Sequence, residues 1–528
     1  MPRHKSIAKR PPPFRNFDFL LVPIYARFSS HLHPALTVVQ PLHTHLLESC
    51  RESELPPGPP TLPIIGNLHL FPTKSPHLKF TEWARTYGGI YSLKIGLGTV
   101  IVVTDPNVVK ELLEKKSGST SDRPAIYFVE LVTRGLHVAL ARYAHSILTA
   151  QAAERHLPIQ QAEAAQLLYD ILCTPEGFFT HGRRYSSSVI MSVLYGKRAP
   201  RYETPETTLF FRMWHEWTAL LEPGATPPID LIPLLRFFPP WPTKWKRAAT
   251  RIRAWQRDLY FRLLGQTEDR LRRGEPNGSY MEEVVRKQKE FGLDRETAAY
   301  FAGALIEGGS DTTSTYLNSF ILCMVAHPHV QKRAQEEIDR IIHRFRPVAP
   351  LLFPHAATKS ERYLNYMIPN GSTIFVNRWG IFHDPDVYED PESFLPERLL
   401  LTENGTKPGL ETSSLKPTLS FGVGRRACAG IHVAQNSINI NVMNLLWAFD
   451  FKPPVDLEGN VIEPDLWGQG ITTDPLPFEC QITPRTREKA ELIRQEFFDA
   501  TDVFEKFEFG LSSEDREFVA QSRRRSSM

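Results

Sequence analysis

The chain has few cysteines, and no two lie close together in the sequence. The 528 residues contain five, which are Cys50, Cys173, Cys323, Cys428 and Cys480. A structural zinc site needs a short spacing such as Cys-x-x-Cys, and a disulfide framework is typical of small secreted chains. Neither pattern is present, so the cysteine usage favours a reducing compartment.

Long apolar runs and strong net charge are also absent. The N-terminal apolar run at 19–26 covers eight residues and is interrupted by Pro23, whereas a membrane span needs ~20. The formal net charge is only +3, which gives no general attraction for nucleic acid. We therefore expect no nucleic-acid partner and an N-terminal segment, 1–54, without a clear transmembrane helix.

What the chain does contain is one cysteine on a loop rich in glycine, Phe421-Gly422-Val423-Gly424-Arg425-Arg426-Ala427-Cys428-Ala429-Gly430. We expect Gly424 and Gly430 to take positive φ values and to let the backbone approach a flat cofactor. Amides at the start of the following helix would favour an ionised Cys428 sulfur. Arg426 would attract a carboxylate. A buried, inert cysteine in a turn is the alternative.

A second pattern lies on a helix that runs from Asp294, its predicted cap, to Ala326 without a proline. Its middle reads Glu307-Gly308-Gly309-Ser310-Asp311-Thr312-Thr313. Each glycine inside a helix costs ~1 kcal/mol relative to alanine, which indicates that this position needs small residues. The Thr312 hydroxyl is expected to bond to the Gly308 carbonyl, four residues back. A simple helix kink is the alternative.

Both patterns resemble motifs of the cytochrome P450 superfamily: Phe-x-x-Gly-x-Arg-x-Cys-x-Gly, and Gly-Gly-x-Asp-Thr. The resemblance implies that Cys428 is the metal ligand of heme b (iron protoporphyrin IX). It also implies a catalytic pair in which Thr312 holds dioxygen and Asp311 relays protons. The implied cofactor-binding residues are Cys428, Arg426, Phe421, Gly424, Gly430 and His355.

The same resemblance implies the reaction and its partners. The enzyme would be a haem-dependent monooxygenase that inserts one atom of O2 into an apolar organic substrate. Electrons would come from NADPH-cytochrome P450 reductase, in an enzyme bound to the cytoplasmic face of the endoplasmic reticulum membrane. The stretch 195–200 is similar to fungal members, which suggests secondary or xenobiotic metabolism.

The expected fold is mainly α within the α+β class, the cytochrome P450 fold, with haem between the long helix and the cysteine loop. Strand-like runs at 90–95 and 99–104 predict a β-hairpin, 368–376 predicts a further strand, and 150–345 is almost wholly helical in pattern. We expect a monooxygenase domain over 55–490. Residues 491–528 are expected to form a solvated, charged tail.

Two family motifs are missing. The position three before Arg344 is Ile341, where family members carry the glutamate of Glu-x-x-Arg. No tryptophan occurs between Trp83 and Trp214, so the family's Trp-x-x-x-Arg is absent as well. Deletions near 143 and 341 would explain both gaps. The alternative function is therefore an inactive or truncated haem-binding remnant.

Overall fold

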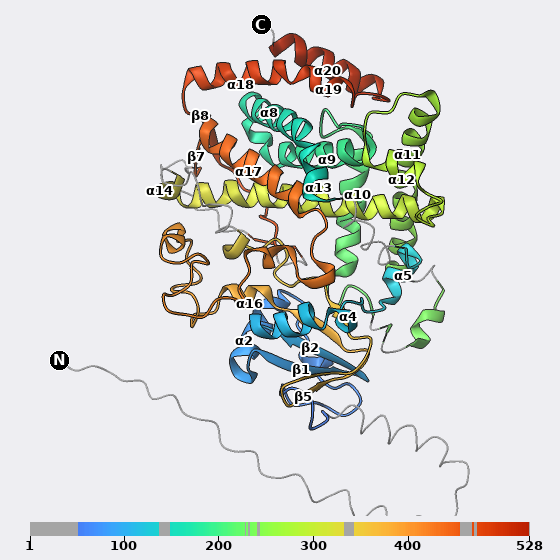
Figure 1. Cartoon of the computed structure of the whole chain (residues 1–528), viewed down its shortest axis with the longest axis vertical. Coiled ribbons are helices and arrows are strands. Elements are labelled where there is room, and N and C mark those ends of the chain that lie inside the picture. Colours follow the sequence, from blue (N-terminus) through green and yellow to red (C-terminus); the bar gives the residue numbers. More distant parts are fainter. Residues whose placement is uncertain are drawn as a thin grey trace, which may run out of the picture.

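Long helices form most of the structure, and small sheets lie mainly toward one end (Figure 1). This computed structural model describes residues 51–136, 148–227, 229–230, 233–239, 243–331, 343–454, 467–468 and 472–526. The two expected deletion points, near 143 and 341, and most of the N-terminal segment lie outside the described residues.

The helices are α2 (Pro76–Tyr87), α3 (Pro106–Val109), α4 (Ser117–Thr120), α5 (Tyr127–Thr133), α7 (Ala150–Glu154), α8 (Leu157–Cys173), α9 (Phe178–Tyr195), α10 (Pro205–Leu221), α11 (Lys244–Arg273), α12 (Tyr280–Arg286), α13 (Arg295–Ala326), α14 (Pro328–Gln331), α16 (Arg378–Phe382), α17 (Ile431–Ala448), α18 (Arg487–Asp499), α19 (Thr501–Glu505) and α20 (Ser513–Ser526). Short helical turns are η1 (Leu68–Leu70), η2 (Lys110–Lys115), η3 (Pro175–Gly177), η4 (Pro233–Phe237), η5 (Pro396–Leu400), η6 (Pro417–Phe421) and η7 (Gly424–Arg426).

The strands are β1 (Ile90–Ile95), β2 (Gly98–Val103), β3 (His355–Ala356), β4 (Glu361–Tyr363), β5 (Tyr366–Ile368), β6 (Thr373–Val376), β7 (Phe449–Lys452) and β8 (Gln481–Pro484). The main sheet has the order β1-β2-β6-β3. The predicted hairpin is confirmed, since β1 and β2 pair antiparallel with Ile95 opposite Gly98. The predicted strand at 368–376 is wrong in detail, because a turn with Gly371 at φ +79° divides it into β5 and β6.

Helix α13 crosses the middle of the molecule (Figure 1) and joins two hydrophobic cores. Its first half, through Ile306, packs with α9, α10, α11 and α12. Its second half, from Tyr316, packs with α8, α9 and α17. The cap is confirmed, because the Asp294 carboxylate accepts the Thr297 N–H at 2.6 Å. The glycine-threonine motif therefore lies between the two cores.

The expectation of a solvated tail is wrong. Helices α18, α19 and α20 lie across the end of the molecule opposite the main sheet (Figure 1). Ile493, Phe497 and Phe504 are at most 5% exposed and belong to the core of α8, α9, α13 and α17. The sequence is rich in charge here, but its apolar residues recur at helical spacing and cover the outer side of α8.

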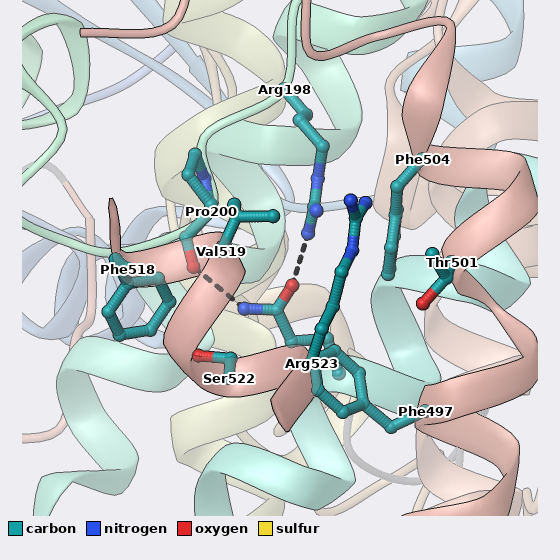
Figure 2. A pocket seen from close by; sticks show the side chains of 10 residues that line it. Arg198, Pro200, Phe497, Thr501, Phe504, Phe518, Val519, Ser522 and Arg523 are labelled. Carbon is teal, nitrogen blue, oxygen red and sulfur yellow. Dashed lines mark hydrogen bonds between the residues drawn. The ribbon is translucent and has the colours of Figure 1, made fainter. Parts of the chain in front are cut away.

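Ion pairs fasten these C-terminal helices to the body. Arg198, which follows α9, donates to Glu508 at 2.9 Å, and Arg523 of α20 donates to the same carboxylate at 2.9 Å. The Arg198 guanidinium lies 3.5 Å from the centre of the Phe504 ring. Figure 2 shows Arg198, Phe504 and Arg523 converging around a small pocket. The tail is therefore part of the folded core.

Replacement of Phe504 by alanine tests this contact. We expect Phe504→Ala to lower stability by about 3–5 kcal/mol, because it removes a buried ring and leaves a cavity under Arg198. Phe498→Ala, at a ring that is 44% exposed in the adjacent helix, is the control and should change stability by about 0.5 kcal/mol or less. Thermal melting of both variants checks this, and equal losses would show that the tail is not packed as described.

Candidate functional site

One face of α13 is open where the two cores meet. Gly308 and Thr312 are exposed, whereas Glu307, Ser310, Asp311 and Thr313 around them are buried. A methyl group built on Gly308 would meet no atom within 4 Å. The Thr312 hydroxyl donates to the Gly308 carbonyl at 2.6 Å, so the predicted hydrogen bond is confirmed. The hydroxyl oxygen is thereby fixed at the border of an open surface inside a buried helix.

The second glycine of the motif, Gly309, is required by a contact with a neighbouring helix. A methyl group on Gly309 would lie 2.7 Å from the Ile190 side chain of α9. Gly309 thus permits close packing of α13 against α9. The two adjacent glycines therefore have different roles. Gly308 faces open space, whereas Gly309 allows the neighbouring helix to pack closely.

The loop around Cys428 is set by two left-handed glycines. Gly422 has φ +86° and Gly424 has φ +60°, and the Gly424 position touches the Leu113 carbonyl so closely that no side chain fits there. The prediction is confirmed for Gly424 but wrong for Gly430, whose φ is −88°. The positive φ of Gly422 was not expected from the sequence. Phe421 fixes the loop through its carbonyl, which accepts the Cys428 N–H at 2.6 Å.

The Cys428 thiol is exposed and lies just before α17. Surrounding protein atoms raise the pKa of its thiol, and the Gly430 N–H, which lowers it, only partly offsets this shift. The expected ionisation by helix amides is therefore not reached by the loop alone. Coordination to a metal ion deprotonates a thiol outright, so this exposed sulfur fits an iron ligand.

Three basic side chains gather beside this loop. Arg426 Nε donates to the Ser121 carbonyl at 2.7 Å, Arg123 donates to the Phe353 and Pro354 carbonyls at 2.8 Å, and His355 Nδ1 lies 3.0 Å from the Thr120 carbonyl oxygen. Burial, followed by the charge of Arg426, lowers the pKa of Arg123 to about 10. An anion such as a haem propionate would relieve this repulsion.

Arg123 is the residue that sequence reasoning missed. Its stretch, Ser121-Asp122-Arg123-Pro124, carries no recognisable signal. Only the folded chain brings it to Arg426, about 300 positions away along the sequence. His355, by contrast, lies where expected, but burial and the charge of Arg123 lower its pKa to about 4. It is therefore a neutral hydrogen-bonding group at pH 7.

Arg344 has no carboxylate partner among the described residues, which exclude the preceding segment 332–342. Its Nη1 donates to the Phe382 carbonyl at 2.9 Å and to the Pro391 carbonyl at 3.3 Å. Its Nε and Nη2 atoms are buried and find no hydrogen-bond partner among the residues that the structure describes. Burial, followed by the charge of Arg398, lowers the pKa of Arg344 to about 10. The position of the lost glutamate, Ile341, lies outside the described residues.

Comparison with known proteins identifies the family. Residues 56–345 and 342–482 match the family model for cytochrome P450. The chain belongs to the cytochrome P450 family. The two matched segments meet at 342–345, which is where the family's Glu-x-x-Arg is interrupted.

Fungal cytochrome P450 monooxygenases are similar over most of the chain. One from Armillaria gallica is 42% identical over 522 residues, covering 92% of this chain and 99% of the relative. One from Arthrobotrys oligospora is 38% identical over 512 residues, covering 87% and 94%. The monooxygenase patI of Penicillium expansum is 34% identical over 504 residues, covering 88% and 96%. The chain is accordingly a haem-dependent monooxygenase.

The residues present fit the haem that this family uses. Cys428 offers a soft sulfur ligand, Arg426 and Arg123 offer charge for the propionates, and Gly308 and Thr312 leave an open surface on α13. When bound, haem supplies the one-electron and dioxygen chemistry, which a cysteine thiolate ligand directs toward O–O cleavage. The protein supplies position, charge and protons.

Proposed function

We propose that this cytochrome P450 holds heme b through Cys428 and inserts one atom of O2 into an apolar organic substrate. The supporting observation is the open face of Gly308 and Thr312 in the centre of an otherwise buried α13. Thr312 Oγ1 holds a fixed orientation there through its bond to Gly308. It can donate or accept a proton at that oxygen, next to a buried acid, Asp311.

NADPH-cytochrome P450 reductase is the proposed electron donor, and the cytoplasmic face of the endoplasmic reticulum membrane is the proposed location. In the part of the chain that the structure describes, no helix is long and apolar enough to span a bilayer. Phe237 and Phe238, which are 83% and 52% exposed, offer an apolar surface for a membrane. Fractionation of cells that express the full chain tests the location, and a chain found only in the soluble fraction would contradict it.

The fungal relatives support a place in fungal secondary or xenobiotic metabolism. The apolar substrate is proposed because α5, α10 and α13 contribute mostly apolar side chains to one core. Spectral titration of the ferric protein with apolar aromatic and terpenoid compounds tests this. Binding of only charged compounds would contradict it.

The role of Thr312 is testable without knowing the substrate. We expect Thr312→Ala to bind haem normally but to release more hydrogen peroxide per NADPH oxidised, because the hydroxyl that manages proton delivery is lost. Thr312→Ser keeps the hydroxyl and should restore the parent ratio. The measurement is peroxide against NADPH with added cytochrome P450 reductase. An unchanged ratio in Thr312→Ala would reduce this residue to a helix-bending role.

A further inference from the structure

A second acid, Asp474, lies on the same side of α13 as Asp311. Thr315, one helical turn after Asp311, donates its hydroxyl proton to Asp474 Oδ1 at 2.6 Å. Asp311 is 5% exposed, whereas Asp474 is partly exposed. Asp474 comes from the chain between α17 and α18, so only the fold brings the two acids together.

The backbone around Asp474 is held from both sides. The Gly468 N–H donates to the Asp474 carbonyl at 2.7 Å, and the Thr473 N–H donates to the Val348 carbonyl at 2.8 Å. These two bonds hold the backbone, and the Thr315 bond holds the Asp474 carboxyl. This is a fixed side chain, not a mobile surface acid.

Neither carboxyl forms a salt bridge with any residue that the structure describes. The groups facing Asp311 are Trp214 of α10, which donates a hydrogen bond, and Arg183 of α9, whose charge also reaches Asp474. Asp311 Oδ2 is buried and has no hydrogen-bond partner within the described part of the chain. Two neighbouring carboxyls that lack an ion pair in the described structure cannot both be ionised cheaply, which favours a proton shared between them even though the Arg183 charge opposes this.

We propose that Asp474 is a positioning residue that acts through Asp311, with which it shares a proton and which it reloads from solvent. The Asp474 O–H bond breaks, an O–H bond forms on the Asp311 carboxylate, and a hydronium ion then protonates Asp474 again. No electrons move. The inference rests on the proposed role of Asp311 and Thr312 in proton delivery.

The protonation behaviour agrees with this geometry. Burial, followed by the negative charge of Asp474, raises the pKa of Asp311 to about 7. Burial also raises the pKa of Asp474, although the Thr315 hydroxyl and Arg183 oppose this. A proton donor is most useful when its pKa is close to the working pH, and Asp311 meets that condition near neutrality.

Asp474→Asn tests the pair through stability. A carboxyl whose pKa is raised by folding destabilises the protein above that pKa, and the penalty is relieved as pH falls through it. Asp474→Asn removes the negative charge that helps to raise the pKa of Asp311 to about 7. Above that pH the variant should therefore melt higher than the parent, by about 2 °C, and this gain should shrink toward acidic pH. Asp502→Asn, at an exposed acid of α19, is the control and should show no such trend. A pH-independent difference for Asp474→Asn would overturn the proposal.

A second measurement tests the relay itself. Peroxide released per NADPH should rise in Asp474→Asn, and its change with pH near 7 should disappear. The double variant Asp311→Asn with Asp474→Asn should release no more peroxide per NADPH than Asp311→Asn alone, because both substitutions interrupt the same proton path. A parent-like ratio in Asp474→Asn would overturn the inference even if Thr312→Ala raises peroxide. Failure of the proposed function would appear separately, as an unchanged ratio in Thr312→Ala.

Discussion

Cys428→Ala is expected to abolish the long-wavelength Soret band of the reduced carbon monoxide complex. That band requires a thiolate on the iron, and Cys428 is the exposed sulfur on the loop that precedes α17. Cys428→His is the informative partner variant, because imidazole is itself an iron ligand and can retain haem while the band is lost. The difference spectrum of the reduced protein, with and without carbon monoxide, is the measurement.

Cys480→Ala provides the control for this experiment. Cys480 is partly buried and packs against the hydrophobic core that contains Phe178 and Phe451, so it is not expected to reach the iron. Its replacement should leave the band in place. An unchanged band in Cys428→Ala or Cys428→His would mean that another group binds the iron, and the assignment of Cys428 would be wrong.

The second large effect concerns two buried arginines that differ in their partners. Arg184 forms ion pairs with Glu163 and with Asp170, and both Arg184 and Glu163 are at most 2% exposed. Arg184→Met should cost about 3–5 kcal/mol, because it leaves Glu163 buried with one partner fewer. Arg344→Met should cost far less or even stabilise the fold, because Arg344 has no carboxylate in the described structure to lose.

The lowered pKa of Arg344 indicates how much the burial of its charge destabilises the folded protein. A folded-state pKa of about 10, against an ordinary value near 12.5, means that burying the unpaired charge costs about 3 kcal/mol at neutral pH. The penalty applies at all pH values below about 10 and falls only as pH rises above that value. The measurement is the melting temperature of Arg184→Met and of Arg344→Met at neutral pH, each compared with the parent protein. Equal losses would show that Arg344 is paired after all.

A graft extends this comparison to the cofactor. We expect purified chains to contain less than one haem each, because the glutamate partner of Arg344 and the Trp-x-x-x-Arg segment are missing from this sequence. Restoring both segments from the Armillaria gallica relative should raise the haem content per chain. Equal haem content in the two proteins would show that the core tolerates both gaps.

Several features of the structure could be predicted from residues that are close together in the sequence. The Asp294 cap, the hydrogen bond of Thr312 to Gly308 and the hairpin of β1 and β2 each depend on residues a few positions apart. Such contacts follow from helix and strand geometry alone. The missing glutamate before Arg344 could be read in the same way, and in the described structure Nε and Nη2 of Arg344 lack a hydrogen-bond partner.

Other features depended on long-range packing, which no local pattern encodes. The sequence could not show that Gly309 meets α9 while Gly308 faces open space, because that depends on where the neighbouring helix lies. Charge made residues 491–528 look solvated, although Phe497 and Phe504 bury themselves against α8 and α9. Arg123 and Asp474 reach the site only through the fold. The sequence by itself indicated the family, which the family match confirms, and it predicts Cys428 as the iron ligand, since both depend on residue identity at close spacing. The tertiary structure decided which charges meet, since this depends on how distant segments pack.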